Sequence, residues 1–100
     1  MEVIYKSKAL EDITYWKKTG NIQIQKKILR LLADIRLHPF EGIGKPEGLK
    51  YDMYGLWSRR ITDEHRFIYE ISNNTIFVIS MKGHYEKSLL IISLIFGFFV

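Results

Sequence analysis

Residues 56–69 read Leu-Trp-Ser-Arg-Arg-Ile-Thr-Asp-Glu-His-Arg-Phe-Ile-Tyr, and this stretch predicts two strands joined by a tight turn at Thr62-Asp63. Because side chains alternate along a strand, one side of the first strand is predicted to carry Trp57, Arg59 and Ile61, and the other Ser58, Arg60 and Thr62. Together with His65 and Arg66, this places much fixed positive charge within sheet-forming sequence. Such charge is costly there unless one face of the sheet stays open to an anion.

Two helices and a first strand are expected before this hairpin. The strand is predicted at Val3–Tyr5. A helix that starts at Ser7 and stops at Gly20 follows from the spacing of its apolar residues, which are Ala9, Leu10, Ile13 and Trp16. A second helix, from about Ile22 to Leu37, has an apolar stripe made of Ile24, Ile28, Leu31, Leu32 and Ile35. Asp12 and Asp34 are expected to lie outside these buried stripes.

The remaining elements complete an α+β domain. Residues 39–50 form a Gly- and Pro-rich loop, residues 49–53 a possible short strand, and residues 75–81 the strongest strand, expected to be central in the sheet. The order is therefore β-α-α-β-β-β. It predicts two antiparallel helices packed on one face of a four- to five-stranded, mostly antiparallel sheet, with part of the basic set on the other face.

Composition narrows the classes of function. One hundred residues with 47% hydrophobic content fit one folded domain, and a net charge of +4 favours a polyanionic partner such as RNA, DNA, a ribosome or a membrane surface. The absence of cysteine excludes disulfides, cysteine-based zinc sites and thiol catalysis, and it fits a cytoplasmic location. The N-terminus has no signal-peptide pattern. No metal site or cofactor is expected, since the three histidines lack zinc-ligand spacing.

The remaining polar residues hold the parts for metal-free RNA cleavage. That reaction uses the 2′-hydroxyl of the substrate as nucleophile and needs a base, an acid and cations for the phosphate. These parts are present in the set Glu47, Arg59, Arg60, Arg66, Lys45, Lys50, His84 and Tyr85. Taken singly, Glu47 is typical of an exposed loop carboxylate, His65 of a structural residue, and Tyr85 of packing as much as of catalysis.

The chain resembles the YoeB toxins of the RelE/ParE superfamily over about nine-tenths of its length. The segments that carry this resemblance are Tyr15-Trp16, residues 39–47, Leu49-Lys50, residues 55–62, Glu64-His65-Arg66 with Tyr69, and His84-Tyr85. The resemblance implies a RelE-like fold and a ribosome-dependent endoribonuclease that cleaves mRNA in the ribosomal A site. It implies Glu47 as general base, His84 as general acid and Arg66 as the main phosphate cation. It also implies that Arg60 and Lys50 help to hold the phosphate and that Tyr85 completes the site. Lys45 and Arg59, from the same basic set, are predicted to contact the phosphate as well.

The resemblance also implies partners. They are a YefM/Phd-like antitoxin whose C-terminal segment covers the basic groove, the 70S ribosome with its mRNA, and operator DNA reached only through the antitoxin complex. A homodimer is plausible in such a family. The related ParE branch acts on DNA gyrase, but Glu47, Arg66 and the His84-Tyr85 pair argue against that branch.

The resemblance covers residues 1–85, and residues 86–100 form an apolar extension of unknown role. The twelve-residue, largely apolar stretch Leu89–Val100 would reach about 18 Å as a helix, against about 30 Å for a bilayer core. An alternative function follows from this extension. The chain would then be a non-catalytic ribosome- or antitoxin-binding module that its own tail inactivates.

Overall fold

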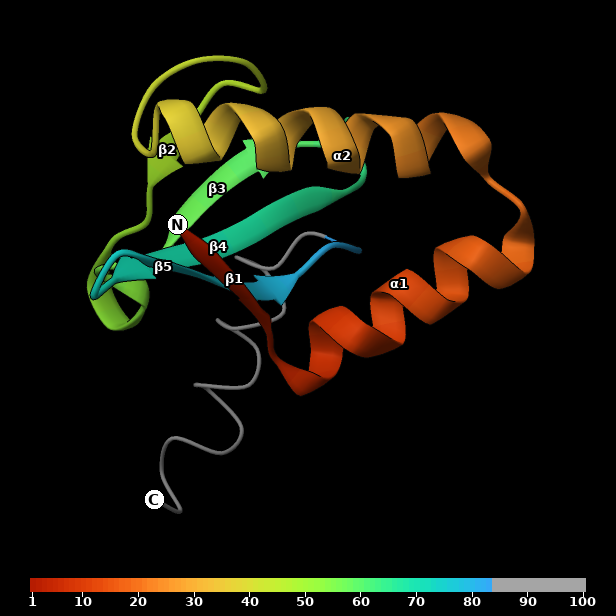
Figure 1. The fold of residues 1–100 in the computed structure, drawn as a ribbon, viewed down its shortest axis with the longest axis horizontal. Helices are drawn as coiled ribbons and strands as arrows, with labels where there is room; N and C mark the ends of the chain where they lie inside the picture. The colour runs from red at the N-terminus through yellow and green to blue at the C-terminus, as the bar shows by residue number, and fades with distance from the viewer. Residues whose placement is uncertain (84–100) are drawn as a thin grey trace.

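The computed structural model describes residues 1–83, which form two helices, a short 3-10 helix and one five-stranded sheet (Figure 1). The elements in chain order are β1 (Glu2–Tyr5), α1 (Ser7–Thr19), α2 (Ile22–Leu37), β2 (Glu47–Gly48), η1 (Tyr51–Met53), β3 (Trp57–Arg60), β4 (Arg66–Ser72) and β5 (Thr75–Ser80). The predicted α+β fold with two helices ahead of the main hairpins is confirmed.

The sheet has the strand order β1-β5-β4-β3-β2. β1 runs parallel to β5, and the other neighbouring strands are antiparallel. The hairpin predicted from residues 56–69 forms β3 and β4, in a register that pairs Trp57 with Tyr69 and Arg60 with Arg66. The next hairpin turns at Asn73 and Asn74, whose positive φ angles of 51° and 55° match the mirror-image turns that suit twisted hairpins.

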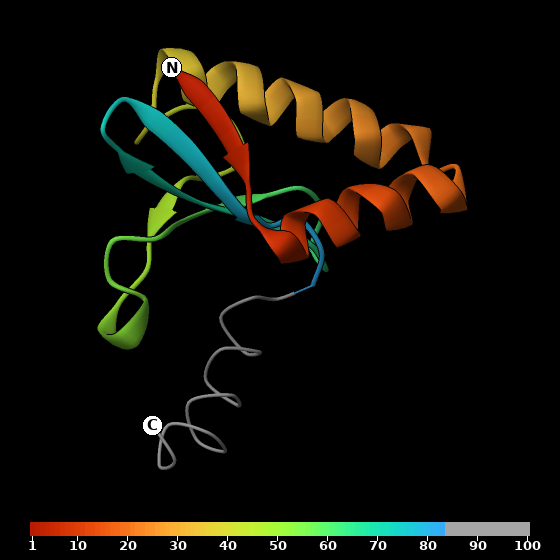
Figure 2. The same cartoon turned by 60° about the horizontal axis from the view of Figure 1, so that its bottom comes forward.

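Both helices cover the same face of the sheet (Figure 2). Their buried side chains meet those of the strands in one core, made of Ala9, Trp16, Ile24, Leu31, Ile35, Ile61, Phe67, Tyr69, Ile76, Val78 and Met81. Two predictions for α1 are wrong. Leu10 is 53% exposed, and Asp12 is buried because it lies three residues after Ala9 and four before Trp16, on the apolar stripe itself.

The opposite face of the sheet carries a smaller apolar cluster. Leu49, Met53 and Ile68 are buried there, so the segment after β2 folds back across this face. The predicted strand at residues 49–53 is wrong: residues 51–53 form the 3-10 helix η1, and Tyr51 has a positive φ of 58°, far from the extended backbone of a regular strand. The short strand lies earlier, at Glu47–Gly48.

Within residues 1–83, neither helix combines the length and apolar character needed to cross a membrane. The predicted boundary between residues 1–85 and 86–100, and the apolar stretch Leu89–Val100, lie outside the described residues and stay predictions.

Candidate active site

Glu47, Arg60 and Arg66 share the face of the sheet that points away from the helices. Arg66 precedes Phe67, which belongs to the helix-side core, so strand alternation directs Arg66 to the other face. Arg60 is directly opposite Arg66, and Glu47 is opposite Ser58, two residues before Arg60. From ordinary strand spacing, the Cα atoms of Glu47 and Arg66 are about 12 Å apart, so a phosphate between the two side chains is within reach of both.

The two arginines place like charges opposite each other. Arg66 is held by the β3–β4 turn, since its Nη1 donates to the carbonyl oxygens of Thr62 (2.6 Å) and Asp63 (3.0 Å). Arg60 is exposed, and its Nη1 lies 3.9 Å from the fully exposed carboxylate of Asp63, an ion pair of little strength. Facing cations destabilise a sheet unless an anion lies between them, so this pair is a candidate site for a phosphate.

Lys45 and Lys50 flank β2, and both are exposed. Lys45 follows Gly44, whose carbonyl oxygen accepts a hydrogen bond from the Arg60 backbone N–H (2.6 Å). This contact keeps the loop beside the strand that carries Arg60. Lys50 immediately precedes η1. The predicted phosphate contacts of both lysines stay predictions.

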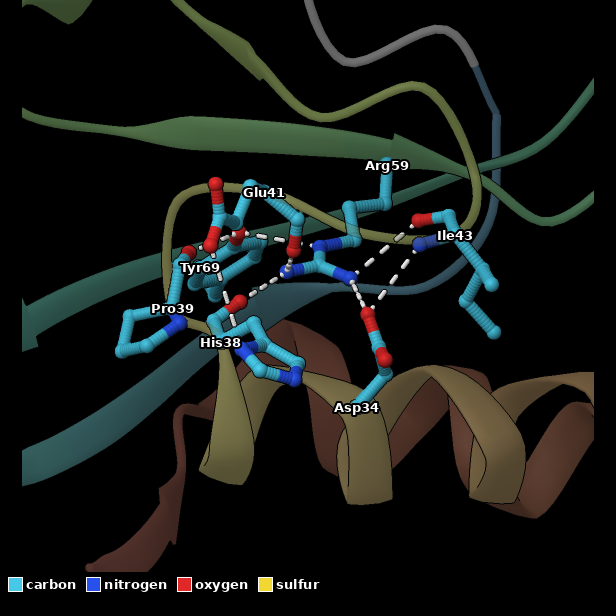
Figure 3. A network of polar contacts seen from close by, with 7 residues as sticks. All are labelled: Asp34, His38, Pro39, Glu41, Ile43, Arg59 and Tyr69. Atoms are coloured by element: carbon cyan, nitrogen blue, oxygen red, sulfur yellow. Dashed lines mark hydrogen bonds and ion pairs between the residues drawn. The ribbon is translucent and has the colours of Figure 1, made fainter.

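Arg59 does not belong to this face, and its predicted phosphate contact is wrong. Its side chain is fully buried on the helix side of the sheet. Nε donates to the Tyr69 hydroxyl (3.1 Å), Nη1 to the Asp34 carboxylate and the Ile43 carbonyl oxygen, and Nη2 to the carbonyl oxygens of His38 and Glu41 (Figure 3). These contacts occupy all the N–H donors of a guanidinium, so none is left for a ligand.

The buried guanidinium instead organises the loop that leads to Glu47. The hydrogen bond from Arg59 holds the pKa of the Asp34 carboxyl below its ordinary value of 3.8, so Asp34 stays ionised. Asp34 also accepts the Ile43 N–H (3.1 Å). Burial raises the pKa of Tyr69 above 10.0, and the protonated hydroxyl donates to the Pro39 carbonyl oxygen (2.6 Å). Together these contacts fix the loop from residue 38 to residue 43.

Gly44 allows the same loop to pack closely against the core. A Cβ at this position would lie 2.7 Å from the Leu31 side chain and 3.2 Å from the Arg60 carbonyl oxygen. The backbone there has a φ of +79°, which favours glycine. The loop can therefore lie against β3 just before Glu47.

His65 has the contacts of a structural residue. Its Nδ1 accepts the Gly83 N–H (2.9 Å), and its ring meets the Trp16 ring edge-on with centroids 4.8 Å apart. The carbonyl oxygen of Gly83 in turn accepts the Arg66 N–H (3.1 Å). The described chain thus ends beside Arg66. The predicted acid His84 and its neighbour Tyr85 lie outside the described residues.

Sequence reasoning missed the network around Arg59. The alternation along β3 separated Arg59 from Arg60 correctly, but it did not say which side the helices would cover. Arg59 shares its side with Trp57 and Ile61, two large apolar residues, and that signal pointed to the buried face.

Residues 5–85 match the family of YoeB-like toxins of bacterial type II toxin-antitoxin systems. Toxin YoeB of Escherichia coli strain K12 is 42% identical over 85 residues, which are 85% of this chain and 100% of that protein. Toxin YoeB of Streptomyces coelicolor is 40% identical over the same shares. The match therefore extends over most of the chain.

Solved structures agree with this assignment. The YoeB/ParE toxin from Agrobacterium tumefaciens superposes with a TM-score of 0.82 at 40% identity, over 85% of this chain and 100% of that one. The toxin in a YoeB-YefM complex from Staphylococcus aureus gives 0.77 at 41%, and a YoeB dimer from the same species 0.78 at 40%, each over 85% of this chain and 98% of theirs. This chain belongs to the family of YoeB-like toxins of bacterial type II toxin-antitoxin systems.

Proposed function

We propose that this toxin is a ribosome-dependent endoribonuclease that cuts mRNA in the ribosomal A site and thereby inhibits translation in the cytoplasm. The observation that carries the proposal is the common face of Glu47, Arg60 and Arg66, with a carboxylate and two facing cations on one side of the sheet. This pairing of charges fits a reaction in which a proton is removed next to a phosphate that gains negative charge.

The proposed reaction needs no nucleophile from the protein. Glu47 takes the proton from the 2′-hydroxyl, and the 2′-oxygen attacks the adjacent phosphorus. The bond from phosphorus to the 5′-oxygen breaks, and His84 donates a proton to that oxygen. The products are a 2′,3′-cyclic phosphate and a 5′-hydroxyl, so atoms and charge balance without water.

The arginines supply the electrostatic part of the reaction. Arg66 is the main cation for the phosphorane, because the turn carbonyls that bind its Nη1 hold the guanidinium in place. Arg60 lies opposite and shares the phosphate. Lys45 and Lys50 are exposed beside β2, where they contribute to binding the RNA backbone, and Tyr85 completes the site.

The partners follow from the family. YefM is the partner in the Staphylococcus aureus complex, so the proposed antitoxin of this chain is a YefM/Phd-like protein that covers the basic face. Operator DNA would be bound only through that complex. A homodimer is the proposed self-associated form, as in the Staphylococcus aureus YoeB dimer.

The test is cleavage of a defined mRNA on purified 70S ribosomes, with 5′ ends mapped relative to the A-site codon. The proposal expects cuts within that codon in the presence of ribosomes and none in free mRNA. Ribosome binding and arrest without cut transcripts would instead establish a non-catalytic binding module. Inhibition of DNA gyrase supercoiling without cut transcripts would assign the chain to the other branch of the superfamily.

A further inference from the structure

The end of β5 is held by side chains from distant elements. Trp16 Nε1 donates to the Met81 carbonyl oxygen (2.9 Å), and the Met81 N–H donates to the Asp12 carboxylate (2.8 Å). His65 Nδ1 accepts the Gly83 N–H (2.9 Å). We name Asp12, Trp16 and His65 the exit clamp, since they fix the backbone over the three residues that follow β5.

Two of the three clamp residues are buried, and the third, His65, is 19% exposed. Asp12 and Trp16 are each 5% exposed, and the clamped residue Met81 is fully buried. The charge of Asp12 is balanced by Lys8, whose Nζ lies 2.8 Å from the carboxylate and also donates to the Lys82 carbonyl oxygen (3.3 Å). A strand end in water would need none of these contacts, because solvent satisfies its backbone groups at no desolvation cost.

The clamp also joins α1 to the turn before β4. Asp12 and Trp16 come from α1, whereas His65 comes from the turn before β4, and the rings of Trp16 and His65 are in edge-on contact. Gly83 meets both His65 and Arg66, through its N–H and its carbonyl oxygen respectively. The backbone that leaves the sheet at Gly83 is therefore fixed relative to Arg66.

We infer that Asp12, Trp16 and His65 are positioning residues for His84, because they fix Gly83, the residue before it in the chain, beside Arg66. This inference rests on the proposed function, since it gives His84 the role of acid. The acid must lie within hydrogen-bond reach of the 5′-oxygen while Arg66 holds the phosphate. A misplacement of about 1 Å can cost about a hundredfold in rate, so a fixed exit point has catalytic value.

The decisive variants change the acceptor on His65. His65→Leu removes the acceptor at similar volume, whereas His65→Asn places Oδ1 at the same number of bonds from Cα as Nδ1 and so keeps one. In single-turnover cleavage on ribosomes, we expect His65→Leu to slow the saturated rate by about ten- to a hundredfold. The toxin concentration that gives half of the saturated rate should stay within about twofold of the wild-type value. His65→Asn should restore most of the saturated rate.

Trp16→Phe gives a second variant should His65→Leu fail to fold. It keeps an aromatic ring but deletes the N–H that Met81 accepts, so the saturated rate should fall with unchanged ribosome affinity. Tyr15→Phe is the matched control, because it changes a neighbouring aromatic residue that is 42% exposed. Full rates in both His65→Leu and Trp16→Phe would overturn the inference, as would equal losses in His65→Leu and His65→Asn.

A spectroscopic arm separates this inference from the proposed function. In the full chain, 1H–15N spectra should show Nδ1 of His65 without a proton and a Gly83 amide that shifts in His65→Leu but not in His65→Asn. If the wild-type chain does not cleave mRNA, the proposed nuclease function fails. The spectra still test whether the exit clamp forms. A protonated Nδ1 at neutral pH, or a Gly83 amide unchanged in His65→Leu, would overturn it.

Discussion

The guanidinium of Arg59 donates a hydrogen bond to the carboxylate of Asp34, and this partly buried ion pair joins β3 to α2. Through the same guanidinium, the carbonyl oxygens of residues 38, 41 and 43 are tied to β3. The loop before Glu47 therefore depends on one fully buried arginine. Its neighbour Arg60, by contrast, is exposed on the opposite face.

Replacement of Arg59 should destabilise the fold severely. Arg59→Ala would leave the Asp34 carboxylate and three carbonyl oxygens without their donor, and the loss of one partner of a buried ion pair costs about 3–5 kcal/mol. Urea unfolding of the full chain measures this. Arg60→Ala is the matched control and should change the free energy of unfolding by less than about 1 kcal/mol. Comparable losses in the two variants would contradict the structural role of Arg59.

The ion pair should also make stability depend on pH. The pKa of Asp34 in the folded chain is below its ordinary value of 3.8, so the contribution of the pair is present above that value. It is lost as the pH falls through the lower folded-state pKa. Asp34→Asn keeps an acceptor but cannot titrate. Urea unfolding between pH 6 and about pH 2 should therefore show the advantage of the wild-type chain shrinking in acid. A constant difference would contradict the assignment.

Glu47→Gln should reduce cleavage without loss of ribosome binding. The amide has nearly the same shape as the carboxylate but cannot accept the 2′-hydroxyl proton, and general bases contribute about 10²- to 10⁴-fold to rates. Single-turnover cleavage gives the rate, and sedimentation with ribosomes gives the affinity. Glu41→Gln is a suitable control, since Glu41 is an exposed carboxylate on the preceding loop. An undiminished rate in Glu47→Gln would remove Glu47 from the mechanism.

Arg66 and Arg60 should differ in their importance. Arg66→Ala removes the cation that the turn holds in place and should lower the saturated rate by about 10²- to 10³-fold. Arg66→Lys keeps the charge but loses the planar two-donor geometry, so it should recover only part of that rate. Arg60→Ala should mainly raise the toxin concentration needed for half-maximal cleavage, because Arg60 is exposed and less constrained. Equal effects of the three variants on the saturated rate would argue against a special role for Arg66.

The sequence predicted the fold better than it predicted the polar interior. The helix stripes around Trp16 and Leu31, apart from Leu10, and the hairpin at residues 56–69 were correct because each depends on local periodicity. Asp12 was misplaced because its partner, the Met81 N–H, lies 69 residues away in the chain. A carboxylate on an apolar stripe is the local sign of such a contact, but it does not identify the partner.

In the candidate site, too, local patterns were predicted correctly and long-range contacts were not. Strand alternation brought Glu47, Arg60 and Arg66 to one face once the pairing of β2, β3 and β4 was known. Alternation also separated Arg59 from that group, yet it could not decide which face the helices cover. The apolar Trp57 and Ile61 on the same side as Arg59 were the local signal for the covered face. The partners of the guanidinium, Asp34 and the loop carbonyl oxygens, lie far from Arg59 in the sequence, and no single strand encodes them.

The central claim is that the 2′-hydroxyl of the mRNA is the nucleophile, activated by Glu47 beside the phosphate that Arg66 holds. The most direct measurement is single-turnover cleavage, on ribosomes, of an mRNA with one 2′-deoxynucleotide at the scissile position. We predict no cut at that position, and 2′,3′-cyclic phosphate and 5′-hydroxyl ends on the unmodified mRNA. Cleavage of the deoxy-substituted mRNA at the normal rate would contradict the mechanism.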